Sequence, residues 1–411
     1  MVGFVSPPSP SIQYRPTMAS SVLDPWASPG GAGQLLSLLR DGVPRTRSEL
    51  AVLTGMSRST VAQRVDALLG SRLIGPAGDA VSTGGRPPTQ FAFNPSSGLV
   101  LAADLGATHA RLGVTDLAGQ VLSELFEDID IADGPEQVLG WVTTTGRTML
   151  EEVATPDQRV VGVGIGLPGP VEHATGRPVR PPIMPGWDGY DVVERLQRDL
   201  GPVAVVDNDV NVMALGEHFT TWPTVDHLVF VKVSTGIGSG IISDGQLRRG
   251  AQGAAGDLGH MQVSHAEDVP CRCGNTGCLE AVAGAAALLE RLRADGVDVR
   301  SGRDIAELAR SGSVEVVQAL REAGRRIGEV LADVVSMLNP SVIVVGGSLA
   351  RSGEHLLAGV REVVYRRSLP LATQHLRIVP GSTGEHAGIV GAAVMVIEQV
   401  LSPVEVDRTV G

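Results

Sequence analysis

The sequence predicts two folding units of different class, a small helical module near the N-terminus and a large α/β domain after it. A chain of 411 residues exceeds the size at which a single hydrophobic core usually stops growing. Helical periodicity broken by polar turns dominates residues 34–95, whereas short Val, Leu and Ile runs alternate with helical stretches after residue 97. The balance of charged residues also differs between the two units. Residues 34–95 hold seven Arg against four acidic residues, although the whole chain carries a formal net charge of −12.

Composition and charge exclude several classes of protein. Hydrophobic residues make up 43% and charged residues 19%, which is typical of a globular chain and not of a fibrous or disordered one. The acidic balance argues against a protein that coats nucleic acid generally, but it leaves room for a small basic DNA-binding module. No apolar run reaches membrane-spanning length, and the N-terminal segment lacks the basic start and apolar core of a signal peptide. We therefore expect a cytoplasmic protein without a membrane partner.

Residues 1–33 contain six Pro together with Ser and Gly, and we interpret them as a flexible leader. From Gln34 the pattern becomes helical, because leucines recur on one side of the predicted helix. Residues 48–54 continue in the same way until Gly55 breaks the pattern, and Ser57 is a good N-cap for another helix. Two helices joined by a short glycine-containing turn form the helix-turn-helix arrangement, whose second helix enters the major groove of DNA.

A winged helix-turn-helix over residues 34–95 leaves a polar face for DNA. Val61 and Val65 recur at helical spacing and point inward, and the alternation of residues 90–93 after a Gly-rich stretch predicts a hairpin wing. The residues expected to contact DNA are Arg47, Ser57, Arg58, Ser59, Thr60, Gln63, Arg64 and Arg86. Arg86 would enter a narrow minor groove, or it is only solvated. The alternative for the whole unit is a three-helix scaffold with a decorative hairpin.

The second unit is predicted to span residues 98–411. Buried strands are expected at residues 99–103, 112–114, 160–165, 203–206, 228–233 and 342–345. Helices are expected at residues 135–153, 192–200 and 314–338. Alternation of strands and helices of these lengths is the pattern of an α/β fold.

Three cysteines and a histidine form the most specific cluster in the sequence. Cys271, Cys273 and Cys278 lie close together, and His260 precedes them. An odd number of cysteines in one cluster is the wrong arrangement for disulfides in a reducing compartment. Three thiolates and an imidazole instead suit a closed tetrahedral Zn²⁺ site, in which the ion is structural. The alternative is a chance group of small buried cysteines.

The cluster lies inside a longer pattern, GDLGHMQV at residues 256–263 and CRCGNTGCLE at residues 271–280, that resembles the ROK family (repressors, open reading frames and kinases). Further matching segments are residues 104–108, 166–171, 207–211, 234–240 and 345–347. Many regulators of this family also carry the preceding winged helix. The resemblance implies an actin-like (ribonuclease H-like), two-lobed sugar kinase fold with the ligand in the cleft.

The resemblance also implies a set of sugar-binding residues, whose carboxylate and amide groups suit sugar hydroxyls. They are Asn208, Asp209, Asp257, His260 and Glu280. Asp257 departs from the family pattern, which usually has glutamate there. His260 would contact both the metal and the sugar, and Asp209 would be the general base in a kinase. For Asn208 and its neighbours the alternative is a polar turn that caps a helix.

A nucleotide-binding side is expected only if the protein is a kinase that uses Mg²⁺-ATP. Its candidate residues are Asp104, Gly106, Thr108, Thr235, Gly236, Gly238, Gly346 and Gly347. Ala107 replaces the second glycine of the family pattern, and His109 replaces its frequent lysine or asparagine. A β-carbon at position 107 hinders the close approach of backbone amides to a phosphate. Glycine loops of this kind also suit a bare β-turn.

The favoured hypothesis is a sugar-responsive, DNA-binding transcriptional regulator, a repressor in carbohydrate metabolism that responds to a small sugar or phosphosugar. The alternative is an ATP-dependent, glucokinase-like hexose kinase with an accessory DNA-binding domain. A zinc scaffold for protein partners alone leaves Asn208, Asp209 and Glu280 unexplained. A single winged helix makes few contacts, so we expect a homodimer or homotetramer on palindromic operator DNA.

Overall fold

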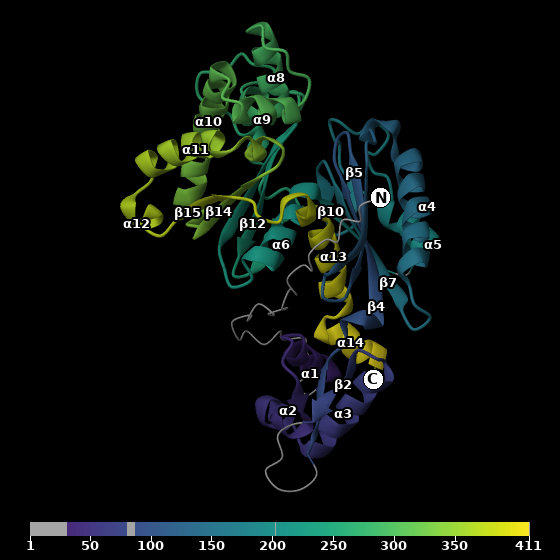
Figure 1. Cartoon of the computed structure of the whole chain (residues 1–411). Helices are drawn as coiled ribbons and strands as arrows, with labels where there is room; N and C mark the ends of the chain where they lie inside the picture. Colours follow the sequence, from purple (N-terminus) through teal and green to yellow (C-terminus); the bar gives the residue numbers. More distant parts are fainter. Residues whose placement is uncertain (1–30, 80–86, 202, 411) are drawn as a thin grey trace, which may run out of the picture.

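The structure of the chain is a computed structural model that describes residues 31–79, 87–201 and 203–410. Arg86 and nearly all of the predicted leader lie outside these ranges. The described residues form an N-terminal unit and two larger lobes (Figure 1). The helix α13 (Ala387–Val400) passes between the lobes and runs toward the N-terminal unit (Figure 1).

The N-terminal unit contains three helices and a small sheet with strand order β1-β3-β2. Its elements are α1 (Ala32–Leu39), β1 (Arg45–Thr46), α2 (Arg47–Thr54), α3 (Arg58–Gly70), β2 (Ile74–Asp79) and β3 (Thr89–Phe93). Because α1 begins at Ala32, the predicted leader was slightly too long. A capping box between Thr46 and Glu49 begins α2, and left-handed Gly55 ends it at φ 70°. Ser57 then caps α3 by accepting a hydrogen bond from the Thr60 N–H at 3.1 Å.

The first lobe is a five-stranded sheet of order β10-β7-β4-β5-β6. Its elements are β4 (Gly98–Leu105), β5 (Ala110–Asp116), β6 (Val121–Glu127), α4 (Pro135–Val153), β7 (Arg159–Leu167), α5 (Val192–Leu200) and β10 (Ala204–Asn208), with the small hairpin β8 (Val171–Glu172) and β9 (Arg177–Pro178) beside it. Side chains alternate along β4, so that Leu101 packs with residues of α4 while Val100 packs with residues of α13. Both faces of the sheet are therefore covered by helices.

The second lobe is a five-stranded sheet of order β13-β12-β11-β14-β15. Its strands are β11 (Leu228–Val233), β12 (Ile237–Ser243), β13 (Gln246–Leu247), β14 (Val342–Gly346) and β15 (Arg377–Pro380). Its helices are α7 (Leu279–Ala283), α8 (Ala285–Ala294), α9 (Gly302–Arg310), α10 (Val314–Leu338), α11 (Glu354–Arg367) and α12 (Pro370–Thr373). Val231 of β11 packs in the cluster that contains α10, whereas Phe230 packs with α6 (Asp209–Thr221), the helix that connects the lobes.

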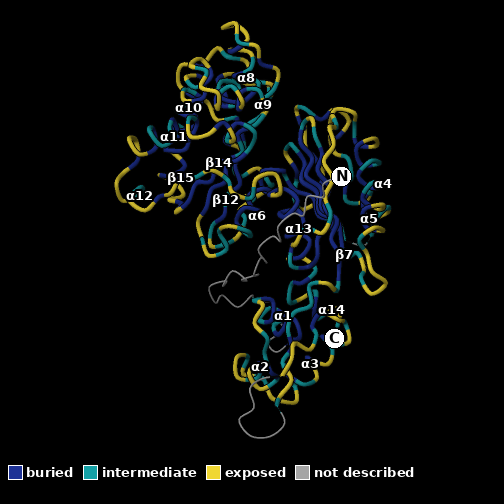
Figure 2. The backbone as a smooth tube through the Cα atoms, viewed as in Figure 1, coloured by how far each residue is buried: buried dark blue, intermediate teal, exposed yellow. Residues whose placement is uncertain are grey.

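The last two helices join the lobes to the N-terminal unit. Residues Ala387 to Ile397 of α13 are all buried, as Figure 2 shows, because the helix is apolar on every side. The following helix α14 (Pro403–Val410) packs against α1, and the Gly33 N–H donates to Asp407 Oδ1 at 2.8 Å. Arg40, the C-cap residue of α1, also pairs with Glu398 of α13 at 2.6 Å. One apolar cluster therefore extends from α1 through α14 and α13 to β4.

The helices predicted at residues 135–153, 192–200 and 314–338 are present with those bounds, and each predicted strand overlaps an observed one. Among the described residues, no single helix is long and apolar enough to cross a bilayer. The segments Gly384–Val400 and Pro403–Val410, bent by 55°, meet the length and composition criteria only as a pair.

Candidate functional site

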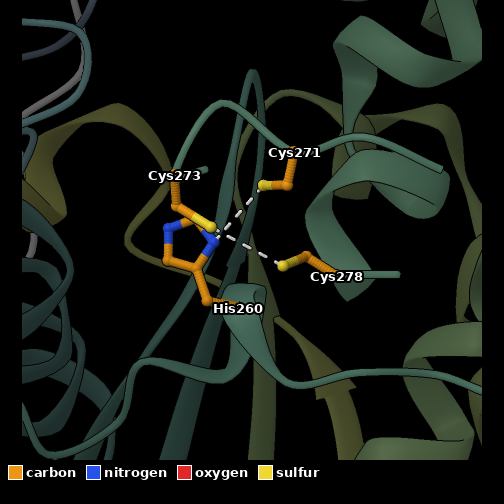
Figure 3. Close-up of side chains that lie close together, drawn as sticks. All are labelled: His260, Cys271, Cys273 and Cys278. Atoms are coloured by element: carbon orange, nitrogen blue, oxygen red, sulfur yellow. Dashed lines mark hydrogen bonds between the residues drawn. The ribbon is translucent and has the colours of Figure 1, made fainter. Parts of the chain in front are cut away.

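Four side chains that could hold a metal ion converge in the second lobe (Figure 3). His260 ends the short 3₁₀ helix Leu258–His260, and the three cysteines come from the loop that follows it. The ligand atoms all lie within 4.8 Å of one another, and Cys273 Sγ is 3.7 Å from Cys278 Sγ. A tetrahedral ion with metal–sulfur bonds of about 2.3 Å separates its sulfur ligands by about 3.8 Å. The observed spacing therefore fits a four-ligand metal site.

The cysteine loop has this shape because of its backbone. Gly274 and Gly277 adopt left-handed conformations at φ 93° and 74°, which reverse the chain on both sides of Asn275. The Cys271 N–H donates to the Asn275 carbonyl at 2.8 Å, and Gln262 forms a β-bridge with Cys278. These backbone contacts bring the thiols together, so the ligand set depends little on side-chain packing.

The thiols differ in how readily they ionise. Burial raises the pKa of Cys278 to about 12, whereas backbone hydrogen bonding lowers the pKa of Cys273. A metal cation would offset the effect of burial, since thiolate and not thiol is the ligand form. His260 Nδ1 faces Cys271 Sγ at 3.6 Å, which leaves Nε2 on the other edge of the ring.

A cavity of about 220 Å³ lies between the lobes and next to the metal ligands. It is lined by all five residues predicted to bind a sugar, namely Asn208, Asp209, Asp257, His260 and Glu280. Asn208 ends β10 and Asp209 begins α6, so these two enter from the first lobe and the connecting helix. The other three come from the second lobe, where Asp257 precedes the 3₁₀ helix, His260 ends it and Glu280 lies in α7. The fold thus brings together residues that are widely separated in the sequence.

Two of the cavity residues are fixed by hydrogen bonds to the backbone. Asn208 Oδ1 accepts from the Val210 N–H at 2.9 Å, and its Nδ2 donates to the Gly169 carbonyl at 3.0 Å. The helix-capping interpretation of Asn208 is therefore confirmed, although the residue also lines the cavity. Glu280 accepts from the Ile237 N–H at 3.1 Å. Such bonds hold the side chains in place before a ligand binds.

Two ion pairs at this site were not predicted from the sequence. The Lys232 ammonium donates to Asp209 Oδ2 at 2.5 Å, and the Arg249 guanidinium donates to Asp207 Oδ2 at 2.5 Å. Asp207 is 1% exposed and also accepts a hydrogen bond from Asn211 Nδ2 at 2.9 Å. It therefore links the end of β10 to the first turn of α6. One signal was available for Lys232, which is the only lysine in the sequence and interrupts a run of buried β-strand residues.

A second cavity of about 750 Å³ adjoins the first and contains only part of the predicted nucleotide-binding set. It is lined by Asp104, Thr108, Thr235, Gly346 and Gly347. Gly236 and Gly238 line the smaller cavity instead. Gly106 lines neither of these two cavities, because the His109 ring packs so closely that a β-carbon on Gly106 would lie 2.2 Å from it. The assignment of Gly106 to a nucleotide site, made for the case of a kinase, stays a prediction.

Two titratable side chains of the second cavity, Asp104 and His109, are affected by burial. Asp104 is 8% exposed, and its Oδ1 has no hydrogen-bond partner among the described residues. Burial raises the pKa of Asp104 to about 6, while the nearby Lys232 opposes that rise. Burial lowers the pKa of His109, whose ring stacks on Phe126 with centroids 6.1 Å apart.

The residues predicted to contact DNA gather mostly on one face of α3. Arg58, Ser59 and Gln63 are exposed, and Arg64 is half-buried. The hydroxyl of Ser57 lies 2.8 Å from those of Ser59 and Thr60, so all three stabilise the start of the helix. Arg47 is engaged within the unit, since it pairs with Asp66 at 2.6 Å and its guanidinium lies 4.8 Å from the Phe91 ring centroid.

The chain is similar over most of its length to proteins of known family. The ROK family model matches residues 100–399. The xylose repressor of Caldicellulosiruptor bescii is 28% identical over 382 residues, which cover 90% of this chain and 95% of that protein.

Solved structures support the same similarity. A ROK family transcriptional regulator, a homolog of the E. coli MLC protein, superposes with a TM-score of 0.80 at 26% identity, covering 92% of this chain and 98% of that one. A ROK family glucokinase from Streptomyces griseus, in complex with glucose and AMPPNP, gives a TM-score of 0.62 at 30% identity, covering 72% of this chain and 98% of that one. The two lobes therefore have the actin-like sugar kinase fold. The match to the regulator covers 92% of this chain, so it must include much of the N-terminal unit. The match to the glucokinase covers 72% of this chain, which is no longer than the two lobes together.

Proposed function

Because the chain belongs to the ROK family, we propose that it is a sugar-responsive, DNA-binding transcriptional regulator that acts as a repressor in carbohydrate metabolism. The observation that carries this proposal is the extent of the similarity to regulators, which includes the N-terminal unit. Glucokinases of the family match only a length equal to the two lobes. The N-terminal unit is thus the part that distinguishes this chain from an enzyme of the same fold.

The N-terminal unit is the DNA-binding module, a winged helix-turn-helix over residues 34–95, and the kinase-like domain spans residues 98–411. Helix α3 enters the major groove with its exposed face, and Arg58 and Gln63 are long enough to reach base edges or phosphates from it. Arg47 has the different task of holding α2 against α3 through Asp66. A twofold homodimer, or a pair of dimers, would place two such helices on a palindromic operator.

The cavity between the lobes binds the sugar. Asn208, Asp209 and Glu280 present carboxylate and amide groups that match hydroxyls, which both donate and accept hydrogen bonds. The adjacent Cys3His cluster holds a structural Zn²⁺, because thiolate and imidazole ligands in a closed tetrahedral set suit that ion. His260 belongs to both sites, so metal binding orients a residue that lines the sugar cavity.

Helix α13 connects the sugar cavity to the DNA-binding module. Near its first turn, Gly388 lies so close to Asp104 that a β-carbon there would be 2.1 Å from the carboxylate. At its other end, Glu398 pairs with Arg40, and α14 holds α1 through Asp407. A change in the angle between the lobes on sugar binding would therefore move α1 through packed helices, without any flexible linker.

A hexose kinase is the second candidate, and the position of Asp209 in the cavity favours it. The phosphate side argues against it. Ala107 replaces a glycine, and the His109 ring packs against Gly106.

Operator binding by the full-length protein tests the proposed function. DNA duplexes that the protein selects from a random pool would be titrated with wild type and with Arg58→Ala. Arg366→Ala is the control, because it also removes an exposed helical arginine, but from α11 in the second lobe. We expect Arg58→Ala to weaken binding by about 1–3 kcal/mol, roughly five- to a hundredfold, and to reduce the salt dependence. Arg366→Ala should bind as wild type does.

The same titration is repeated with each member of a panel of pentoses and hexoses. At least one sugar should shift the operator affinity, since regulation requires different affinities of the ligand for the two states. Failure to select any duplex, or equal binding by Arg58→Ala and Arg366→Ala, would contradict the proposal.

A further inference from the structure

The only lysine of the chain lies at the junction of the two cavities. Lys232 is on β11 of the second lobe, its side chain is 15% exposed, and it lines both the smaller and the larger cavity. Its ammonium donates to Asp209 Oδ2 at 2.5 Å. Asp209 begins the helix that connects the lobes, and its side chain is only 6% exposed. A buried ammonium is therefore fixed on the carboxylate that faces the sugar cavity.

A second carboxylate, that of Asp104, lines the larger cavity together with Lys232, although no ion pair joins these two residues. Asp104 is the residue before the last of β4 in the first lobe, and its Oδ1 has no hydrogen-bond partner among the described residues. Burial opposes the protonated form of Lys232, but Asp209 and Asp104 outweigh it, so the pKa of Lys232 is raised. One cation from the second lobe is thus paired with the carboxylate of the connecting helix and shares a cavity with a carboxylate of the first lobe.

Transfer of a phosphoryl group requires different chemistry at such a place. A divalent cation, held by carboxylates directly or through water, neutralises the phosphates as charge develops. The Lys232 ammonium, which is paired with Asp209 Oδ2 and lines both cavities, repels such a cation and already occupies one of the oxygens that would bind it. The residues present therefore do not fit Mg²⁺-ATP.

We propose that Lys232 is an internal counter-ion that takes the place of a divalent metal at Asp209, where the two cavities meet, so that the cleft excludes metal–nucleotide and serves only to bind a sugar. The proposal rests on the function proposed above and assigns the residue that separates sensing from catalysis. It explains why Asp209 is present in a site that transfers no phosphate. Lys232 is then a specificity-determining residue, and its removal should restore affinity for a divalent cation.

The test measures binding of Mn²⁺, with and without the non-hydrolysable analogue AMPPNP, to the full-length protein saturated with Zn²⁺. Mn²⁺ prefers oxygen ligands, so it reports the carboxylates and not the cysteine cluster, and its free concentration is followed by electron paramagnetic resonance. Lys232→Met removes the charge and keeps the length of the side chain, and Lys232→Arg keeps the charge as a matched control. We expect Mn²⁺–AMPPNP to bind Lys232→Met at least about tenfold more tightly than wild type or Lys232→Arg.

Equal affinity of wild type and Lys232→Met would overturn the proposal, as would formation of a sugar phosphate by wild type with Mg²⁺-ATP. If Lys232→Met does not fold, Lys232→Gln replaces it. In either case, micromolar binding of Mn²⁺–AMPPNP to wild type is sufficient to refute the counter-ion role. Failure of the proposed regulatory function would instead be seen with unmodified protein in the operator titration, which needs neither metal nor nucleotide.

Discussion

Replacement of Asp209 by Asn tests the sugar cavity directly, because it removes a charge and keeps the shape of the side chain. Asp209 lines the cavity and is 4% exposed, so a bond from it to a sugar hydroxyl is shielded from water. A hydrogen bond to a charged group contributes about 1.5–3 kcal/mol. Its loss should weaken sugar binding by roughly ten- to a hundredfold. The same change weakens the ion pair with Lys232.

Loss of one partner from a buried ion pair costs about 3–5 kcal/mol of stability. The amide oxygen of Asn still accepts a hydrogen bond from Lys232, so the free energy of unfolding should fall by less than that. Sugar affinity would be measured by calorimetry and stability by urea unfolding, both on folded full-length protein. Asp199→Asn is the control, because Asp199 is ion-paired with Arg195 at 2.7 Å and lies outside the cavity. Wild-type sugar affinity in folded Asp209→Asn would refute the assignment of the cavity.

Three further predictions concern the metal, the helix junction and pH. Elemental analysis should find about one Zn²⁺ per chain, and Cys273→Ser should lower both the zinc content and the sugar affinity; protein prepared without chelator that lacks zinc would contradict this. Asp407→Ala removes the acceptor of the Gly33 N–H, so urea unfolding should show a loss of about 1 kcal/mol, and the sugar should affect operator binding less. Burial raises the pKa of Asp104 to about 6, so its contribution to stability is present below about pH 4 and is lost as the pH rises through 6. Asp104→Asn should therefore gain up to about 3 kcal/mol relative to wild type between pH 4 and pH 7, and a difference that does not change with pH would contradict this reasoning.

The sequence by itself determined the features that depend on neighbouring residues. Helices such as Val314–Leu338 were predicted because their apolar residues recur at helical spacing along one segment. The Cys3His group was predicted because three of its ligands lie on one short loop, where glycines at positions 274 and 277 fix the backbone. The five cavity residues were expected together only through the resemblance to a family, since their positions range from 208 to 280.

The tertiary structure alone decided how distant segments meet. Helix α13 is apolar on all sides, so its sequence has no periodicity that reveals which elements cover it, and its role between β4 and α14 follows only from the packing of both lobes. Lys232 was visible as the single lysine, but its partners come from β4 and α6, which the chain reaches by different routes. Burial decides what such a charge does, because an ammonium in water binds no particular carboxylate, whereas one enclosed between two lobes must be neutralised by the groups that the fold places beside it.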